Sequence, residues 1–120
     1  MNTTPLHSAR IPGFKVVSRH RLGDVFHESQ SAFYVLLGFR EATGAPREHV
    51  VFVDCVDDVL DACQKQIDEL WEKHRVMITH VAVKLGAPFR STQRDLKKAY
   101  ERALAVQELR RKLNPEFRRL

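Results

Sequence analysis

Histidine, cysteine and aspartate are the residue types in this chain that could carry catalytic or metal chemistry. The chain has six histidines and two cysteines, but none of them has the His-x-x-x-His or Cys-x-x-Cys spacing typical of zinc ligands. Cys63 falls on an apolar helical stripe, where a thiol is buried and inert, and this disfavours a nucleophilic Cys55 or Cys63. We therefore expect no catalytic residue, no metal site and no cofactor. A small enzyme with a pocket near Asp54 and His80 is the least favoured alternative.

Basic residues are concentrated in the last third of the chain. Residues 84–120 carry eleven bases against four acids, a net charge of +7. Arg94, Lys98 and Arg102 recur at i, i+4 spacing on one face of a predicted helix, where like charges destabilise the helix. Lysine and arginine on such a face bind nucleic-acid phosphates and release counterions. The main hypothesis is a small non-catalytic, nucleic-acid-associated accessory or regulatory protein with DNA or RNA as its partner. The predicted contacts are Arg90, Arg94, Lys97, Lys98, Arg102, Arg111 and Lys112.

An acidic stretch offers an alternative partner for the same helix. Residues 54–72 carry seven acids against one base, a net charge of −6. The alternative hypothesis is a homo-oligomeric protein-interaction module, most simply a homodimer, in which acidic helix 54–72 pairs with basic helix 92–113. An acidic protein partner would use the same basic face. The predicted interface residues are Asp57, Asp61, Asp68, Leu109, Arg110 and Leu113.

Four segments have the β-branched and aromatic content of strands, namely 14–19, 32–40, 49–54 and 76–85. Segment 32–40 contains Gly38, which weakens a helix. A helix over 24–40 stays an alternative, because periodicity does not resolve short apolar runs. The consecutive apolar residues of 49–54 predict a central strand. This strand, the following helix and strand 76–85 could form a parallel β-α-β unit.

Two amphipathic helices are predicted. Residues 54–74 place apolar side chains on one stripe, and Asp54 or Asp57 is expected to cap the N-terminus. The helix at 92–113 ends before Pro115, because the residue preceding a proline disfavours helix. Its first four turns are expected to dock on the sheet and its last turns to project or to contact something else. The apolar residues of that docking stripe are Leu96, Ala99, Tyr100, Ala103, Leu104 and Val106.

These elements predict a single α+β domain of order β-β-β-α-β-α. A sheet of about four strands carries both helices on one face. The 120 residues suit one domain, with a flexible N-terminal tail at 1–13, the domain at 14–114 and a basic C-terminal tail at 115–120. No apolar run approaches the ~18 residues that span a bilayer, so no membrane partner is expected. Two cysteines without a disulfide pattern favour a cytoplasmic location.

Overall fold

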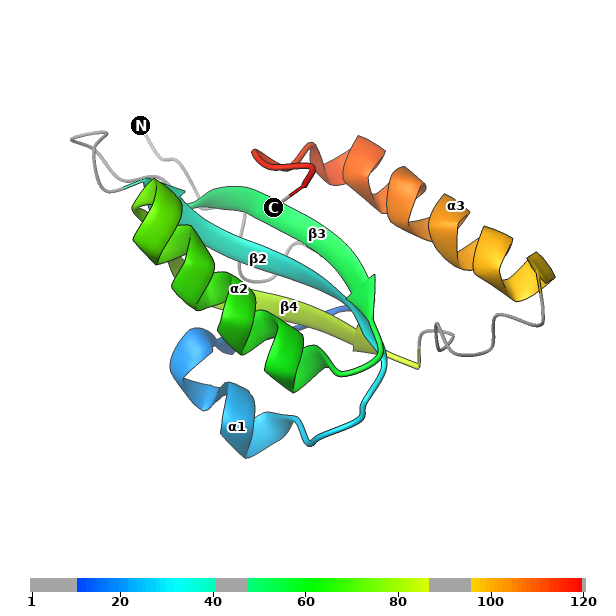
Figure 1. Ribbon diagram of the computed structural model, residues 1–120, viewed down its shortest axis with the longest axis horizontal. Helices are drawn as coiled ribbons and strands as arrows, with labels where there is room; N and C mark the ends of the chain where they lie inside the picture. The colour runs from blue at the N-terminus through cyan, green and yellow to red at the C-terminus, as the bar shows by residue number, and fades with distance from the viewer. Residues whose placement is uncertain (1–10, 41–47, 87–95, 120) are drawn as a thin grey trace.

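The chain folds into one antiparallel sheet of four strands in the order β1-β4-β2-β3. The computed structural model describes residues 11–40, 48–86 and 96–119. The strands are β1 (Lys15–Ser18), β2 (Ala32–Arg40), β3 (His49–Val56) and β4 (Val76–Leu85). The helices are α1 (Leu22–Val25), α2 (Val59–His74) and α3 (Leu96–Leu113), and a 3-10 turn covers Arg19–Arg21. The α+β class and the order of the main elements are confirmed (Figure 1).

The central strand β2 confirms the strand prediction for 32–40, and the alternative helix over 24–40 is wrong. Strand β2 lies between β4 and β3 and is hydrogen-bonded to both. Its Gly38 is required by a close approach to β4, because a Cβ atom there would lie 2.0 Å from the carbonyl oxygen of Met77. A shift in the β2–β4 register begins at the same glycine.

The predicted parallel β-α-β unit of β3, α2 and β4 is present in strand direction, but its two strands are not neighbours in the sheet. Both strands are antiparallel to β2, so they point in the same direction, but β2 lies between them. Figure 1 shows β3 and β4 on either side of β2 with their arrowheads at the same end of the sheet. Strand β3 is also an edge strand, not the central strand predicted. Its residues Val50–Val53 are nevertheless buried, because a helix covers each face of the sheet beside them.

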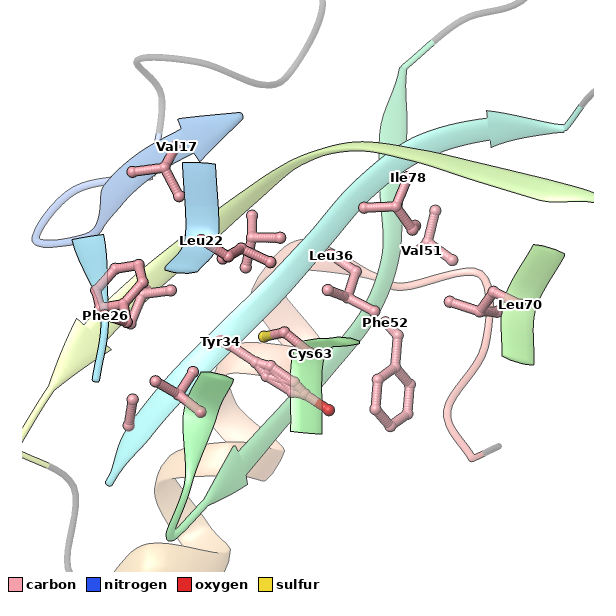
Figure 2. Close-up of a cluster of buried hydrophobic side chains, with 14 of the residues drawn as sticks. Val17, Leu22, Phe26, Tyr34, Leu36, Val51, Phe52, Cys63, Leu70 and Ile78 are labelled. Atoms are coloured by element: carbon pink, nitrogen blue, oxygen red, sulfur yellow. The ribbon is translucent and has the colours of Figure 1, made fainter. Parts of the chain in front are cut away.

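Helix α2 covers one face of the sheet (Figure 1) and packs against the larger core cluster, whose side chains are drawn in Figure 2. Leu36, Cys63 and Leu70 are fully buried there. The ring of Tyr34 packs edge-on against Phe52 with 6.1 Å between ring centroids. The Tyr34 hydroxyl is buried without a hydrogen-bond partner in the described part of the chain, and this burial raises the pKa of the phenol. Tyr34 therefore stabilises the core through its ring, because an unpaired buried hydroxyl costs roughly 1–3 kcal/mol.

Helix α2 starts later than predicted because β3 extends further along the chain. Its N-cap is Asp58, so the prediction that Asp54 or Asp57 caps this helix is wrong. The Asp58 carboxylate accepts hydrogen bonds from the backbone N–H groups of Asp61 (3.1 Å) and Ser29 (3.1 Å). These bonds favour the ionised form and hold the pKa of Asp58 below its usual value.

The two long helices lie on opposite faces of the sheet, so the prediction of both helices on one face is wrong. Alternate residues of β2 show this, since successive strand residues point to opposite faces. Tyr34 and Leu36 belong to the cluster under α2, whereas Val35 and Leu37 belong to the cluster that α3 contacts. Ile11 is buried in this second cluster, so packing begins inside the segment predicted as a tail.

Candidate interaction surface on helix α3

Helix α3 packs on the sheet through its C-terminal half. Val106 is buried with Cys55 and packs against Phe33. Leu109 and Leu113, two of the predicted interface residues, are partly buried against the second core cluster. The three side chains recur at i, i+3 and i+7, which places them on one side of the helix. Together with two arginines described next, they form the docking face, which consists of Arg102, Val106, Leu109, Arg110 and Leu113.

The two arginines of the docking face bind the outer edge of β3. Arg102 donates from Nη2 to the carbonyl oxygen of Cys55 at 2.6 Å. Arg110 donates from Nε to the carbonyl oxygen of Val53 at 3.1 Å. An edge strand presents unpaired backbone groups that can recruit a strand from another chain. The two arginines therefore cover this edge of the sheet from within the chain.

Each arginine also pairs with an aspartate near the end of β3. Nη1 of Arg102 lies 3.1 Å from Oδ1 of Asp57, and Nη2 of Arg110 lies 3.6 Å from Oδ1 of Asp54. The Arg102 side chain is only 13% exposed, so its guanidinium group is largely shielded while it bonds a carbonyl and a carboxylate. Two of the acidic residues thus pair with two of the basic residues within one chain, where α3 meets the end of β3.

The segment after α3 continues along the same edge of the sheet. The backbone N–H groups of Glu116 and Phe117 donate to the carbonyl oxygens of Val50 (3.0 Å) and Val51 (2.9 Å). Both donors lie in the stretch predicted as the basic tail 115–120. The carbonyl groups of residues 51, 53 and 55 are therefore capped in turn by a backbone N–H group and two guanidinium groups.

The N-terminal half of α3 exposes apolar side chains. Leu96, Tyr100 and Leu104 are 81%, 65% and 45% exposed. At about 100° per residue they share one side of the helix, roughly a third of a turn from the docking face. Figure 1 shows this orange end of α3 beyond the tip of β3. We call this side the exposed stripe, which consists of Leu96, Tyr100, Ala103, Leu104 and Gln107.

The exposed stripe reverses one prediction about α3. The first four turns were expected to dock on the sheet and the last turns to project, but the helix docks through its last turns. The helical wheel identified the apolar side correctly, but the sheet contacts a different side, where arginines flank Val106. Sequence reasoning therefore missed Arg102 as a cap of β3. The available signal was the i, i+4, i+7 and i+11 spacing of Arg102, Val106, Leu109 and Leu113.

Four of the residues predicted to bind nucleic acid are not among the exposed basic side chains that the structure describes. Arg90 and Arg94 lie outside the described residues. Lys98 lies in α3, and its side chain is also outside the described part. Arg102 faces β3.

The other three predicted phosphate contacts are exposed on α3. Lys97, Arg111 and Lys112 lie there among the exposed acids Glu101 and Glu108. Nη2 of Arg111 donates to Glu108 at 2.5 Å, and this bond holds the pKa of the Glu108 carboxyl below its usual value. Among the side chains of α3 that the structure describes, the exposed charge is therefore mixed, with a small positive excess. Such a surface attracts phosphates less strongly than a continuous basic ladder.

The three acids predicted for an interface are separated by the fold. Asp57 binds Arg102 of the same chain. Asp61 forms an i, i+4 pair with Lys65 at 3.1 Å, and Asp68 is exposed on α2. Asp61 and Asp68 thus belong to the helix on one face of the sheet, and the docking face of α3 contacts the other face.

The residues considered for an enzyme site are not brought together. Asp54 is opposite Tyr34 in the β2–β3 register, whereas His80 is opposite Leu37 in the β2–β4 register. The two side chains therefore belong to strands separated by β2 and to different levels of the sheet. Burial raises the pKa of the Cys55 thiol to about 11, and a neutral thiol is a poor nucleophile.

Comparisons of the chain with protein-family models, curated proteins and solved structures found no match. Within residues 11–40, 48–86 and 96–119, no three His, Cys, Asp or Glu side chains are grouped in a way that could hold a metal ion. None of the described helices is long and apolar enough to cross a membrane. Large apolar side chains left in water on a helix that is docked through its other side are typical of a binding surface, which makes the exposed stripe the candidate site.

Proposed function

We propose that this chain is a protein-interaction module whose contact element is the exposed stripe of α3. The observation that supports the proposal most directly is the exposure of Leu96, Tyr100 and Leu104 on one side of the helix. Fully burying one large apolar side chain contributes roughly 1.5–3 kcal/mol. A protein surface that covered all three would therefore gain several kcal/mol that the fold of the single chain leaves unused.

The attachment of α3 supports the same function. The helix is held at its C-terminal half by Val106, by the bonds from Arg102 and Arg110, and by the backbone pairing of Glu116 and Phe117 with β3. A partner of the exposed stripe would thus meet a helix that is already formed and anchored. Such preorganisation lowers the entropy cost of association.

Site-specific photo-cross-linking in cells tests this function. A photo-cross-linking amino acid replaces Tyr100 in the exposed stripe, and the control carries it at Gln64, an exposed position of α2. We expect a discrete adduct with a protein chain from position 100 and none of that size from position 64. Equal or absent cross-linking at the two positions would contradict the proposal.

Binding to DNA or RNA is the second candidate function. The observation in its favour is that Lys97, Arg111 and Lys112 are exposed on α3, in a chain of net charge +5. Phosphate binding falls steeply with salt, so fluorescence anisotropy with labelled DNA and RNA is measured at about 50 mM and 200 mM salt. We expect affinity that falls with salt and that the double variant Lys97→Glu, Lys112→Glu loses. No binding at the lower salt concentration contradicts this candidate.

A further inference from the structure

We infer that the exposed stripe of α3 binds the exposed stripe of a second copy of this chain, with the two helices antiparallel. The inference rests on the proposed function and names its partner. It differs from the charge-driven dimer considered from the sequence, because Arg102 and Arg110 of the docking face are bound to β3 of their own chain. Apolar contact is then what drives association, and charge selects the orientation.

The spacing of the exposed stripe suits a helix partner. Leu96, Tyr100, Ala103 and Gln107 follow one another at intervals of four, three and four residues. This is the spacing of the seam at which two helices pack with knobs into holes. The seam covers eleven residue steps, about 16 Å at 1.5 Å per residue. A partner helix of the same length would cover the whole stripe, and α3 itself has that length and that seam.

Side-chain size supports a two-fold axis close to Ala103. This small residue lies between Tyr100 and Gln107 in the seam and is itself exposed. A small residue at a crossing point allows two helix backbones to approach closely. In an antiparallel pair centred there, the two Ala103 side chains face each other and each Tyr100 lies within one helical turn of Ala103 of the other copy. Leu104 of each copy lies within one turn of the axis and contacts its counterpart.

Charge supports the antiparallel orientation over the parallel one. Lys97 and Glu108 lie on the same flank of the exposed stripe, eleven residues apart, and both are exposed. Their midpoint falls between Arg102 and Ala103, next to the proposed axis. An antiparallel pair therefore places Lys97 at the level of Glu108 of the second copy, and does so twice. A parallel pair places the two copies of this flank on opposite sides of the interface, so that Lys97 does not meet Glu108 of the second copy.

A seam of this length predicts a weak, reversible dimer. Contacts below the standard interface size are typical of transient complexes, so we expect a dissociation constant on the order of 10–100 µM. Salt separates this dimer from the charge-driven alternative. An apolar seam persists at about 0.5 M salt, whereas pairing between acidic and basic helices is screened.

Sedimentation velocity over roughly 5–500 µM protein measures the dimer directly. We expect a concentration-dependent dimer for the natural chain, and at least a tenfold weaker dimer for Leu104→Glu. The matched control is Leu85→Glu, because Leu85 is 47% exposed and Leu104 is 45% exposed, and Leu85 lies outside α3. Circular dichroism confirms that both variants are folded. A natural chain that stays monomeric over the whole range, or an equal loss in both variants, overturns the inference.

Charge reversal tests the orientation. Lys97→Glu and Glu108→Lys alone each place like charges together in an antiparallel pair, so each variant dimerises less than the natural chain in low salt. An equimolar mixture restores two opposite-charge pairs, and we expect the mixed dimer to form more readily than either parent dimer. No preference for the mixed dimer overturns the antiparallel arrangement.

Different outcomes contradict the proposed interaction function and the inference that the partner is a second copy. If the natural chain is monomeric but position 100 still cross-links to a different protein in cells, the interaction function stands and the second-copy inference is overturned. If position 100 yields no adduct above the control while the purified chain still dimerises through Leu104, the seam is supported as a self-association surface and the proposed cellular interaction is contradicted.

Discussion

Removing the Arg102 side chain should destabilise the fold by about 2–3 kcal/mol, even though this residue lies on a charged helix near the surface. The substitution Arg102→Ala deletes the hydrogen bond to the Cys55 carbonyl and the ion pair with Asp57. The residue was predicted from the sequence to contact phosphate. The effect of the substitution on the free energy of unfolding therefore tests whether Arg102 stabilises the fold through its contacts with Cys55 and Asp57.

The magnitude follows from the two contacts. A hydrogen bond from a charged donor contributes about 1.5–3 kcal/mol. The Cys55 carbonyl lies at the sheet edge, where water can replace the guanidinium group, so the lower half of that range applies. The Asp57 side chain is 37% exposed, and ion pairs at such sites contribute about 0.2–1 kcal/mol. Arg102→Lys keeps the charge but not the fork geometry, so we expect an intermediate loss.

Urea unfolding at a few micromolar protein, where dimerisation is minor, measures these effects. With an m-value of about 1.5 kcal/mol per molar, Arg102→Ala should lower the midpoint by roughly 1–2 M. The control is Arg111→Ala, because Arg111 is 71% exposed and pairs with Glu108 on its own helix. We expect its loss to be much smaller than that of Arg102→Ala, because solvent screens an exposed pair.

A double-mutant cycle isolates the ion pair. Arg102→Ala, Asp57→Ala and the combination should give a coupling energy of about 0.5–1 kcal/mol, with the remainder of the arginine effect independent of Asp57. The reasoning would be refuted by equal, small losses in Arg102→Ala and Arg111→Ala. It would also be refuted by a loss that vanishes entirely in the Asp57→Ala background, since the carbonyl bond would then contribute nothing.

Three further predictions concern stability. Gly38→Ala should destabilise the fold by at least about 3 kcal/mol, because the added Cβ atom would lie 2.0 Å from a carbonyl oxygen of β4. The control Gly23→Ala should be neutral or stabilising, because no atom lies within 4 Å of a Cβ at that position. Similar losses of both variants in urea unfolding would contradict this. Tyr34→Phe should be neutral or stabilise by up to about 1 kcal/mol. Because burial raises the pKa of this phenol, the unfolded chain loses the proton first, and the free energy of unfolding falls as pH rises above about 10. The urea midpoint of Tyr34→Phe should therefore fall less at alkaline pH than that of the natural chain. An equal fall in both proteins would contradict the burial of the Tyr34 hydroxyl. Asp58→Ala should cost about 1 kcal/mol through loss of the α2 cap, and Asp58→Asn should keep most of the cap. The hydrogen bond from Asp61 lowers the pKa of Asp58. This carboxylate therefore stabilises the fold above about pH 4, and the stabilisation is lost as pH falls through the lowered pKa. Identical acid unfolding curves for the natural chain and Asp58→Asn would contradict this pH dependence.

Local patterns in the sequence predicted most of the secondary structure. The β-branched content of 32–40 and 76–85 and the apolar stripe of α2 correspond to elements of the fold. Pro115 correctly predicted the end of α3, which stops at Leu113. These features depend on a residue and its near neighbours, and this is why sequence periodicity was sufficient to detect them.

The candidate site was predicted less well, because it depends on which surfaces meet. The sequence indicated the apolar side of α3 but not the position of the sheet, so Leu96 and Tyr100 were expected to be buried and are exposed. It indicated a ladder of basic residues but not that Arg102 would meet an edge strand. The acidic partner of that arginine was predicted on a helix, yet Asp57 lies between β3 and α2.

By itself, the sequence determined the elements, their order and the two charged regions, because helical and strand periodicity and net charge are properties of the chain alone. Tertiary structure decided that β2 separates β3 from β4, that α2 and α3 lie on opposite faces, and that α3 docks through arginines and leaves its apolar stripe in water. The physical reason is that a side chain is buried only where another surface covers it. In this chain the covering surface for Arg102 and Val106 is an edge strand some fifty residues earlier in the sequence.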